Sequence, residues 1–281
     1  MLKVALTHDV DRTIKSYQCL THAIKSIGSG NLKKAAYHLL SWKKRKEVYW
    51  NIDKIIEIEQ KYNVKSTFFF LNESFPFKLY KPSSWKLALG RYDINEKKIT
   101  ETIKYLDSNG WEIGLHGSFE SYKNLRLLRK EKVSIEKILE HEVYGIRQHY
   151  LNLTDYTWKI QHTIGFKYDS SWGYTRNIGY KDNKIEPFKP ISNNFIVFPL
   201  AIMDSCYMNK INRLDSLRNI IDKTIENDAI LVVNWHTNKF NEKEFPGFKS
   251  AYVDLIEEFL KWGASFDTLI NYYNRIPSRL N

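Results

Sequence analysis

The sequence predicts an α/β protein whose βα units surround a parallel sheet, as in an α/β barrel. Short apolar runs rich in β-branched and aromatic residues alternate with longer amphipathic stretches, which is the pattern of βα units around a parallel sheet. The length of 281 residues suits one such unit, since α/β barrels of this size fold around a single core. Polar residues capable of catalysis follow several of the apolar runs, as in a barrel active site. We therefore expect residues 1–281 to form one domain.

The strands are expected where the apolar runs are short, at 2–7, 66–71, 112–116, 145–150, 195–200 and 230–235, with shorter ones at 167–170 and 264–266. Between them, apolar side chains recur at helical spacing beside a polar face, as helices packed outside a barrel require. These helices are expected at 52–62, 96–108, 122–141, 154–163, 214–227 and 252–262.

Residues 13–48 form a long basic insertion between the first strand and the first regular helix. Gly28 and Gly30 divide it into two helices, the second at 32–45. One interpretation is a lid over the carboxyl end of the sheet. A helix lying on a membrane surface is the other, because leucines such as Leu32 and Leu39 oppose several lysines.

Composition excludes several classes of protein. The net charge of +11 suggests nucleic acid, but the lysines are spread along the chain and no recognised binding module is present. Cys19 and Cys206 match no metal or redox spacing, which fits a reducing compartment. The N-terminus has no secretory signal, and no apolar run approaches the roughly 20 residues of a membrane span. We expect a cytoplasmic protein without a transmembrane segment, for which peripheral membrane contact stays open.

The clearest chemical motif is the pair Asp9 and Asp11 at the end of the first strand. Side chains two apart on an extended backbone point the same way, so the two carboxylates can converge on one site. An Asp-x-Asp in a loop is more often a turn than a site, but its place at a strand end favours the site.

Four further blocks end other strands. His116 and Glu120 can put two metal-capable side chains on one side of a turn. A buried Arg147 would need a carboxylate partner such as Asp9. The remaining blocks are YDSSWGY at 168–174 and NWHT at 234–237, where His236 suits a general acid because its unperturbed pKa lies near neutrality.

In order and content, these blocks resemble the polysaccharide deacetylase family, also called carbohydrate esterase family 4 or the NodB-homology family. The resemblance covers nearly the whole chain apart from the insertion. It implies a distorted (β/α) barrel, commonly of seven strands, that removes N- or O-acetyl groups with one divalent metal, usually zinc.

The resemblance also implies a role for each motif residue. Asp9 would be the general base, Arg147 would orient it, and His236 would protonate the leaving amine. The metal ligands would be Asp11, His116 and Glu120, and the backbone N–H of Tyr150 would help to bind the oxyanion. The groove that holds the sugar would be lined by Asp169, Trp172 and Trp235.

Two positions depart from the family pattern. Glu120 stands where the family has a second histidine ligand, and His149 stands where it has a proline. A carboxylate can bind zinc, so Asp11, His116 and Glu120 could form a facial triad. The alternatives are that His149 or His8 supplies the third ligand.

The implied function is hydrolysis of an acyl group, N-acetyl above all, on a sugar in surface-polysaccharide or lipopolysaccharide biosynthesis. The competing hypothesis is a non-catalytic carbohydrate-binding relative that has lost the metal site.

Overall fold

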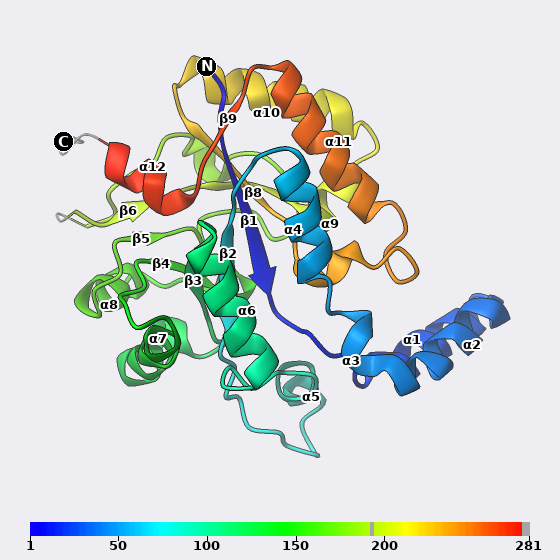
Figure 1. Ribbon diagram of the computed structural model, residues 1–281. Helices are drawn as coiled ribbons and strands as arrows, with labels where there is room; N and C mark the ends of the chain where they lie inside the picture. The colour runs from blue at the N-terminus through cyan, green and yellow to red at the C-terminus, as the bar shows by residue number, and fades with distance from the viewer. Residues whose placement is uncertain (192–193, 277–281) are drawn as a thin grey trace.

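A parallel sheet forms the centre of the computed structural model, which describes residues 1–191 and 194–276 (Figure 1). Its strands lie in the order β6-β5-β4-β3-β2-β1-β8-β7, and β9 pairs with β1. Their bounds are β1 (Lys3–Val10), β2 (Thr67–Leu71), β3 (Glu112–Gly117), β4 (Gly145–Gln148), β5 (Tyr168–Asp169), β6 (Ile196–Val197), β7 (Leu200–Met203), β8 (Ile230–Asn234) and β9 (Ser265–Phe266).

β1 is the strand on which the rest of the sheet is organised. Its residues from Val4 to Val10 are all buried, which is the burial that a parallel strand covered on both faces requires. It pairs in parallel with β2 on one side and β8 on the other, and Thr7 lies opposite both Thr67 and Asn234. The carboxyl ends of these strands therefore lie at the same edge of the sheet.

Amphipathic helices surround the sheet, as Figure 1 shows. The apolar side chains of the strands and of the inner helix faces form one large buried cluster, and strand residues such as Ala5, Phe69 and Val232 form a second, smaller one with Leu269 and Tyr272 of α12. The helices outside the insertion are α4 (Ile52–Lys61), α5 (Pro82–Ala88), α6 (Lys97–Ser108), α7 (Leu125–Leu139), α8 (Thr157–Thr163), α9 (Asp204–Met208), α10 (Arg213–Glu226), α11 (Phe248–Lys261) and α12 (Leu269–Arg275).

The predicted barrel class is confirmed, with nine strands in the described residues where the family resemblance implied seven. The run expected as one strand at 195–200 is divided into β6, which pairs with β5, and β7, which pairs with β8. A single parallel bridge from Gly173 to Leu200 joins β7 to the segment after β5, so the barrel is closed irregularly.

The insertion after β1 is helical, as predicted. α1 (Gln18–Gly28) and α2 (Leu32–Leu40) form a hairpin that projects from the body in Figure 1, and α3 (Arg45–Val48) leads back to it. α2 ends at Leu40 and not at residue 45, because the chain tightens into a 3₁₀ turn, η1 (Ser41–Lys44). Within the described residues, each helix is too short or too polar to cross a membrane.

Candidate active site

Asp9 lies at the centre of a buried polar cluster at the carboxyl ends of the strands. Its Oδ1 accepts a hydrogen bond from Nη1 of Arg147 on β4 at 2.9 Å, and its Oδ2 accepts one from Nδ2 of Asn234 on β8 at 2.7 Å. Burial raises the pKa of Asp9, but the charges of Arg147, His116 and His236 outweigh it and hold the pKa below its ordinary value. Asp9 is therefore an ionised and firmly oriented carboxylate, as a general base must be.

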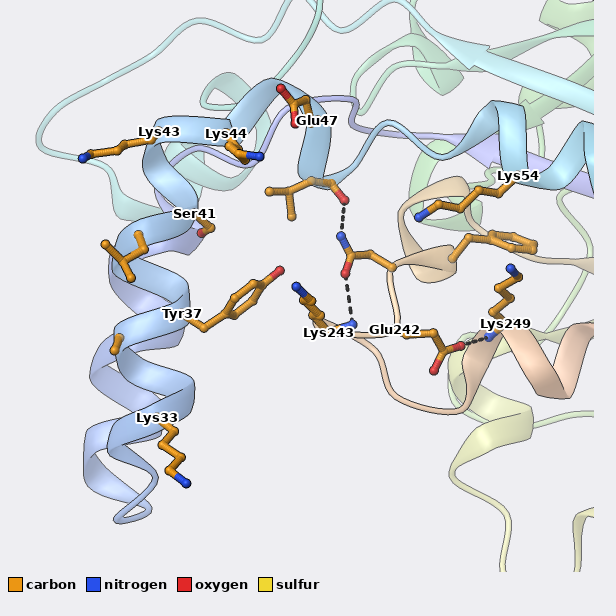
Figure 2. Close-up of a pocket in the computed structure, with 15 residues that line it drawn as sticks. Lys33, Tyr37, Ser41, Lys43, Lys44, Glu47, Lys54, Glu242, Lys243 and Lys249 are labelled. Carbon is orange, nitrogen blue, oxygen red and sulfur yellow. Dashed lines mark hydrogen bonds between the residues drawn. The ribbon is translucent and has the colours of Figure 1, made fainter.

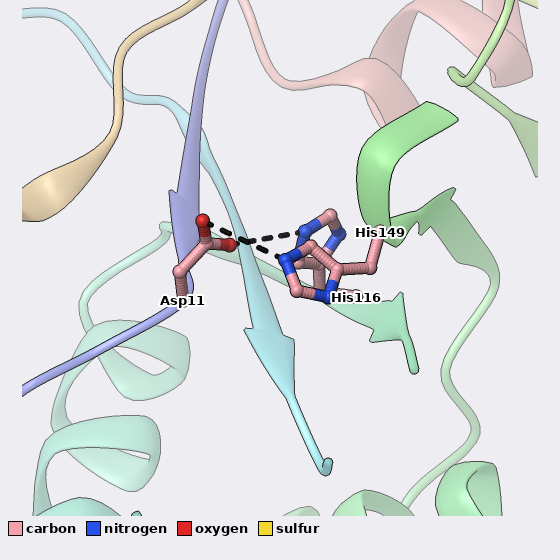
Figure 3. A group of neighbouring side chains, drawn as sticks. All are labelled: Asp11, His116 and His149. Carbon is pink, nitrogen blue, oxygen red and sulfur yellow. Dashed lines mark ion pairs between the residues drawn. The ribbon is translucent and has the colours of Figure 1, made fainter. Parts of the chain in front are cut away.

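Asp11, His116 and His149 form a second group beside Asp9 (Figure 3). Nε2 of His116 lies 3.1 Å from Oδ1 of Asp11, and Nε2 of His149 lies 3.9 Å from Oδ2 of the same carboxylate. One donor atom from each of the three residues lies within 4.8 Å of the other two. Asp11 comes from the end of β1, His116 from β3 and His149 from the turn after β4.

This group fits a divalent cation. Oδ1 of Asp11 is buried and accepts no hydrogen bond from any described residue. The Nδ1–H of His116 donates to the backbone carbonyl of Arg147 at 2.9 Å, which directs Nε2 towards Asp11. Two imidazole nitrogens and one carboxylate oxygen are a donor set that zinc and similar metals accept, with positions left for water and substrate.

Glu73 lies behind His149, at a position that the sequence analysis did not single out. Its Oε1 accepts from the N–H of Phe75 at 2.8 Å and its Oε2 from the N–H of Phe119 at 3.0 Å. Oε2 also lies 3.7 Å from Nδ1 of His149. Burial raises the pKa of Glu73, but the contact with His149 and the two N–H groups bring it below its ordinary value. A charged Glu73 would keep the histidine ring turned towards Asp11.

His236 is held on the opposite side by Asp204, the second residue that the sequence analysis missed. Oδ2 of Asp204 accepts from both the backbone N–H and Nδ1 of His236, each at 2.7 Å. Burial lowers the pKa of His236, but Asp204 outweighs it and raises the pKa to about 9. Nε2 of His236 lies 3.8 Å from Asp11 and 3.9 Å from Asp9, so the imidazolium faces the site.

The structure does not bring Glu120 into the metal group. Its side chain is 38% exposed and pairs with Lys123 at 2.8 Å. His8 is excluded as well, because Nδ1 bonds the backbone carbonyl of Trp235 at 2.7 Å and Nε2 contacts Glu59 in the core at 2.9 Å. His149 is thus the one of the three candidate third ligands that faces Asp11 and His116.

The residues expected to line the sugar groove are mostly internal. Trp235 is fully buried, and Asp169 is buried too, where it accepts hydrogen bonds from Ser171 and Gln161. Trp172 is partly exposed, with the ammonium of Lys181 4.2 Å from its ring centroid. Tyr150 is different: its ring is 51% exposed and its φ is +59°, a left-handed conformation beside His149. Asp169 and Trp235 therefore lie beneath the surface and do not line a groove.

Comparisons with known proteins establish the fold. No family model and no curated protein matches the sequence. A Mycobacterium smegmatis protein assigned as a polysaccharide deacetylase shares the fold with a TM-score of 0.60 at 15% identity, over 97% of this chain and 89% of that one. The Puue allantoinase gives 0.58 at 11% identity, over the same shares of the two chains. The resemblance to the deacetylase family is thus confirmed at the level of the fold, which an allantoinase also has.

Proposed function

We propose that this protein is a metal-dependent hydrolase that removes an acyl group, N-acetyl above all, from a sugar. One observation carries the proposal: the carboxylate of Asp9, the group of Asp11, His116 and His149, and the imidazole of His236 meet at one end of the barrel. A base, a cation site and an acid within about 4 Å of one another are the parts that acyl hydrolysis needs.

The residues divide the chemistry between them. A divalent cation, for which zinc is our proposal, would be held by Asp11, His116 and His149 and would supply a Lewis acid for the acyl carbonyl and for water. Asp9 accepts the proton of the attacking water, and Arg147 fixes the orientation of the Asp9 carboxylate. The N–H near Tyr150 is proposed to donate to the oxyanion.

His236 completes the reaction as the general acid. Because Asp204 engages Nδ1, the proton that can be transferred is the one on Nε2, which faces Asp9 and Asp11. That proton goes to the departing sugar nitrogen, which leaves as an amine. The motif resemblance supports a sugar substrate, in surface-polysaccharide or lipopolysaccharide biosynthesis. Trp172 is the aromatic residue of the expected groove that stays partly accessible.

Metal content and acetate release from an N-acetylglucosamine oligomer test the proposal together. We expect one zinc or similar ion per chain, lost in His149→Ala and kept in the matched Glu120→Ala variant. Asp9→Asn should keep the metal and lose about 10²–10⁴-fold in rate. A native protein that takes up no metal when zinc is supplied would contradict the hydrolase. Glycan binding that is unchanged by Asp9→Asn, without acetate release, would favour the carbohydrate-binding relative.

A further inference from the structure

The hairpin of α1 and α2 exposes an unusual amount of apolar surface. On α1, Leu20, Ile24 and Ile27 are 59%, 59% and 53% exposed. On α2, Leu32 and Leu39 are 69% and 51% exposed. Single exposed leucines are ordinary, but two parallel stripes on adjoining helices mark an interaction surface.

The two stripes lie on the same side of the hairpin. Each helix packs on the other through small or polar residues, and several exposed apolar residues stand one position after an inward-facing one. Successive side chains are about 100° apart around a helix axis. In an antiparallel pair, the residues that follow inward-facing ones therefore point to the same side of both helices. The inward residues are Cys19, Ala23 and Ser26 on α1 and Ala35 and His38 on α2.

A buried ionic cluster fixes the hairpin to the body. Nζ of Lys15 is fully buried, bonds Nδ1 of His38 at 2.8 Å and pairs with Glu244. Nδ1 of His22, on the polar side of α1, lies 3.5 Å from the same Glu244. The ammonium stands between the histidine and the carboxylate, so this cluster is an anchor and not a cation site. It leaves the apolar stripes facing away from the body.

The insertion that carries the hairpin also holds most of the net charge of the protein. Residues 12–46 contain nine of the 43 basic residues and none of the 32 acidic ones. Beside α2 lies a groove of about 1000 Å³ between the hairpin and the segment before α11. Figure 2 shows its lysines on both walls: Lys33, Lys43, Lys44, Lys54, Lys243 and Lys249.

We propose that the hairpin docks the protein on an anionic lipid bilayer, with the apolar stripes in the acyl boundary and the lysines at the headgroups. Exposed leucines and isoleucines beside lysines are the combination that interfacial helices use. In the groove the lysines outnumber the carboxylates, Glu47 and Glu242, by six to two. A second copy of the chain would bring two strongly positive insertions together, which disfavours a dimer. Nucleic acid would use the lysines and leave the apolar stripes unexplained. The inference goes beyond the proposed function and does not depend on it, since it is tested without activity.

Co-sedimentation of the full chain with vesicles tests the proposal. Binding is expected to phosphatidylcholine vesicles that contain phosphatidylglycerol, and to be much weaker with phosphatidylcholine alone. Changing Leu20, Ile24 and Ile27 together to Ser should lower the partition coefficient at least about tenfold. Changing Lys43, Lys44 and Lys46 to Gln should lower it about fivefold for each charge. All six side chains are exposed, so the fold should survive.

Matched changes elsewhere provide the controls. Ile211, just before α10, and Leu214, in its first turn, are 99% and 57% exposed, and their Ser variants should bind vesicles like the native chain. A label at Ile24→Cys should enter the bilayer, shown by quenching with brominated lipid, and one at Leu214→Cys should not. The proposal is overturned if the native chain ignores anionic vesicles, if the α1 triple variant binds them unchanged, or if that variant instead abolishes a dimer seen by ultracentrifugation.

Discussion

Replacing Arg147 with Met should cost the protein about 3–5 kcal/mol of unfolding free energy. Arg147 is fully buried, and its guanidinium donates hydrogen bonds of 2.7–2.9 Å to Asp9, Thr7 and both the backbone carbonyl and the hydroxyl of Ser170. Without it, the carboxylate of Asp9 is left 3% exposed with no guanidinium beside it. Breaking a buried ion pair on one side has a cost of this size because the remaining charge stays desolvated.

Urea unfolding followed by circular dichroism measures this loss. The matched control is Arg218→Met, whose side chain is 61% exposed and 4.0 Å from Asp215, and which should lose at most about 1 kcal/mol. Combining Arg147→Met with Asp9→Leu should restore part of the stability, since no unpaired charge is then buried. The reasoning is refuted if Arg147→Met stays within about 1 kcal/mol of the native chain, or if the double variant is no more stable than the single one.

Three further outcomes are expected. Glu73→Gln should weaken zinc binding about 10–100-fold in a chelator competition, because His149 loses its charged support, and unchanged affinity would contradict that role. His8→Leu should leave zinc affinity intact while lowering the unfolding free energy by about 1–3 kcal/mol, because Glu59 loses a buried partner. Burial raises the pKa of Glu112 from 4.5 to about 7, so the folded state binds a proton that the unfolded state releases. The resulting gain in unfolding free energy is full below pH 4.5 and is lost as pH rises through 7. Relative to Glu112→Gln, the native chain should lose about 3 kcal/mol over that range, and parallel pH profiles of the two would refute the shift.

Residues at strand ends could be placed from sequence because the fold fixes where strand ends go. Asp9, Asp11, His116 and Arg147 follow apolar runs, and the carboxyl ends of parallel strands meet at one edge of the sheet. The same reasoning anticipated that Arg147 would need Asp9, since a buried guanidinium requires a carboxylate.

The third ligand could not be placed in this way, because it depends on where a turn leads. After β3 the chain enters a short 3₁₀ turn, η2 (Ser121–Lys123), and Glu120 before it is directed outwards to Lys123. His149 lies at a different strand end, in the turn η3 (His149–Leu151) after β4, and approaches Asp11 from there. The spacing of residues along the chain does not show which of two turns brings its side chain to Asp11.

Glu73 and Asp204 were missed for a related reason. Each follows a strand by one or two residues, β2 for Glu73 and β7 for Asp204, so the strand-end argument applied to them as well. Their importance depends on a partner distant in sequence, His149 for Glu73 and His236 for Asp204, and no pattern near either residue indicates that partner. For Trp235 the prediction was wrong in the other sense. It was expected to line the sugar groove, and the structure packs it against Tyr252 in the core.

Most of the net positive charge of the chain comes from the insertion. Outside residues 12–46, 34 basic residues nearly balance 32 acidic ones, so a general enrichment in lysine does not account for the charge of +11. The excess lies in a segment that begins directly after Asp11, at the mouth of the site. A hairpin docked on lipid would therefore hold the catalytic end of the barrel near the bilayer. Under the proposed function, that geometry favours a sugar attached to a lipid over a free glycan in solution, because only the former stays at the surface.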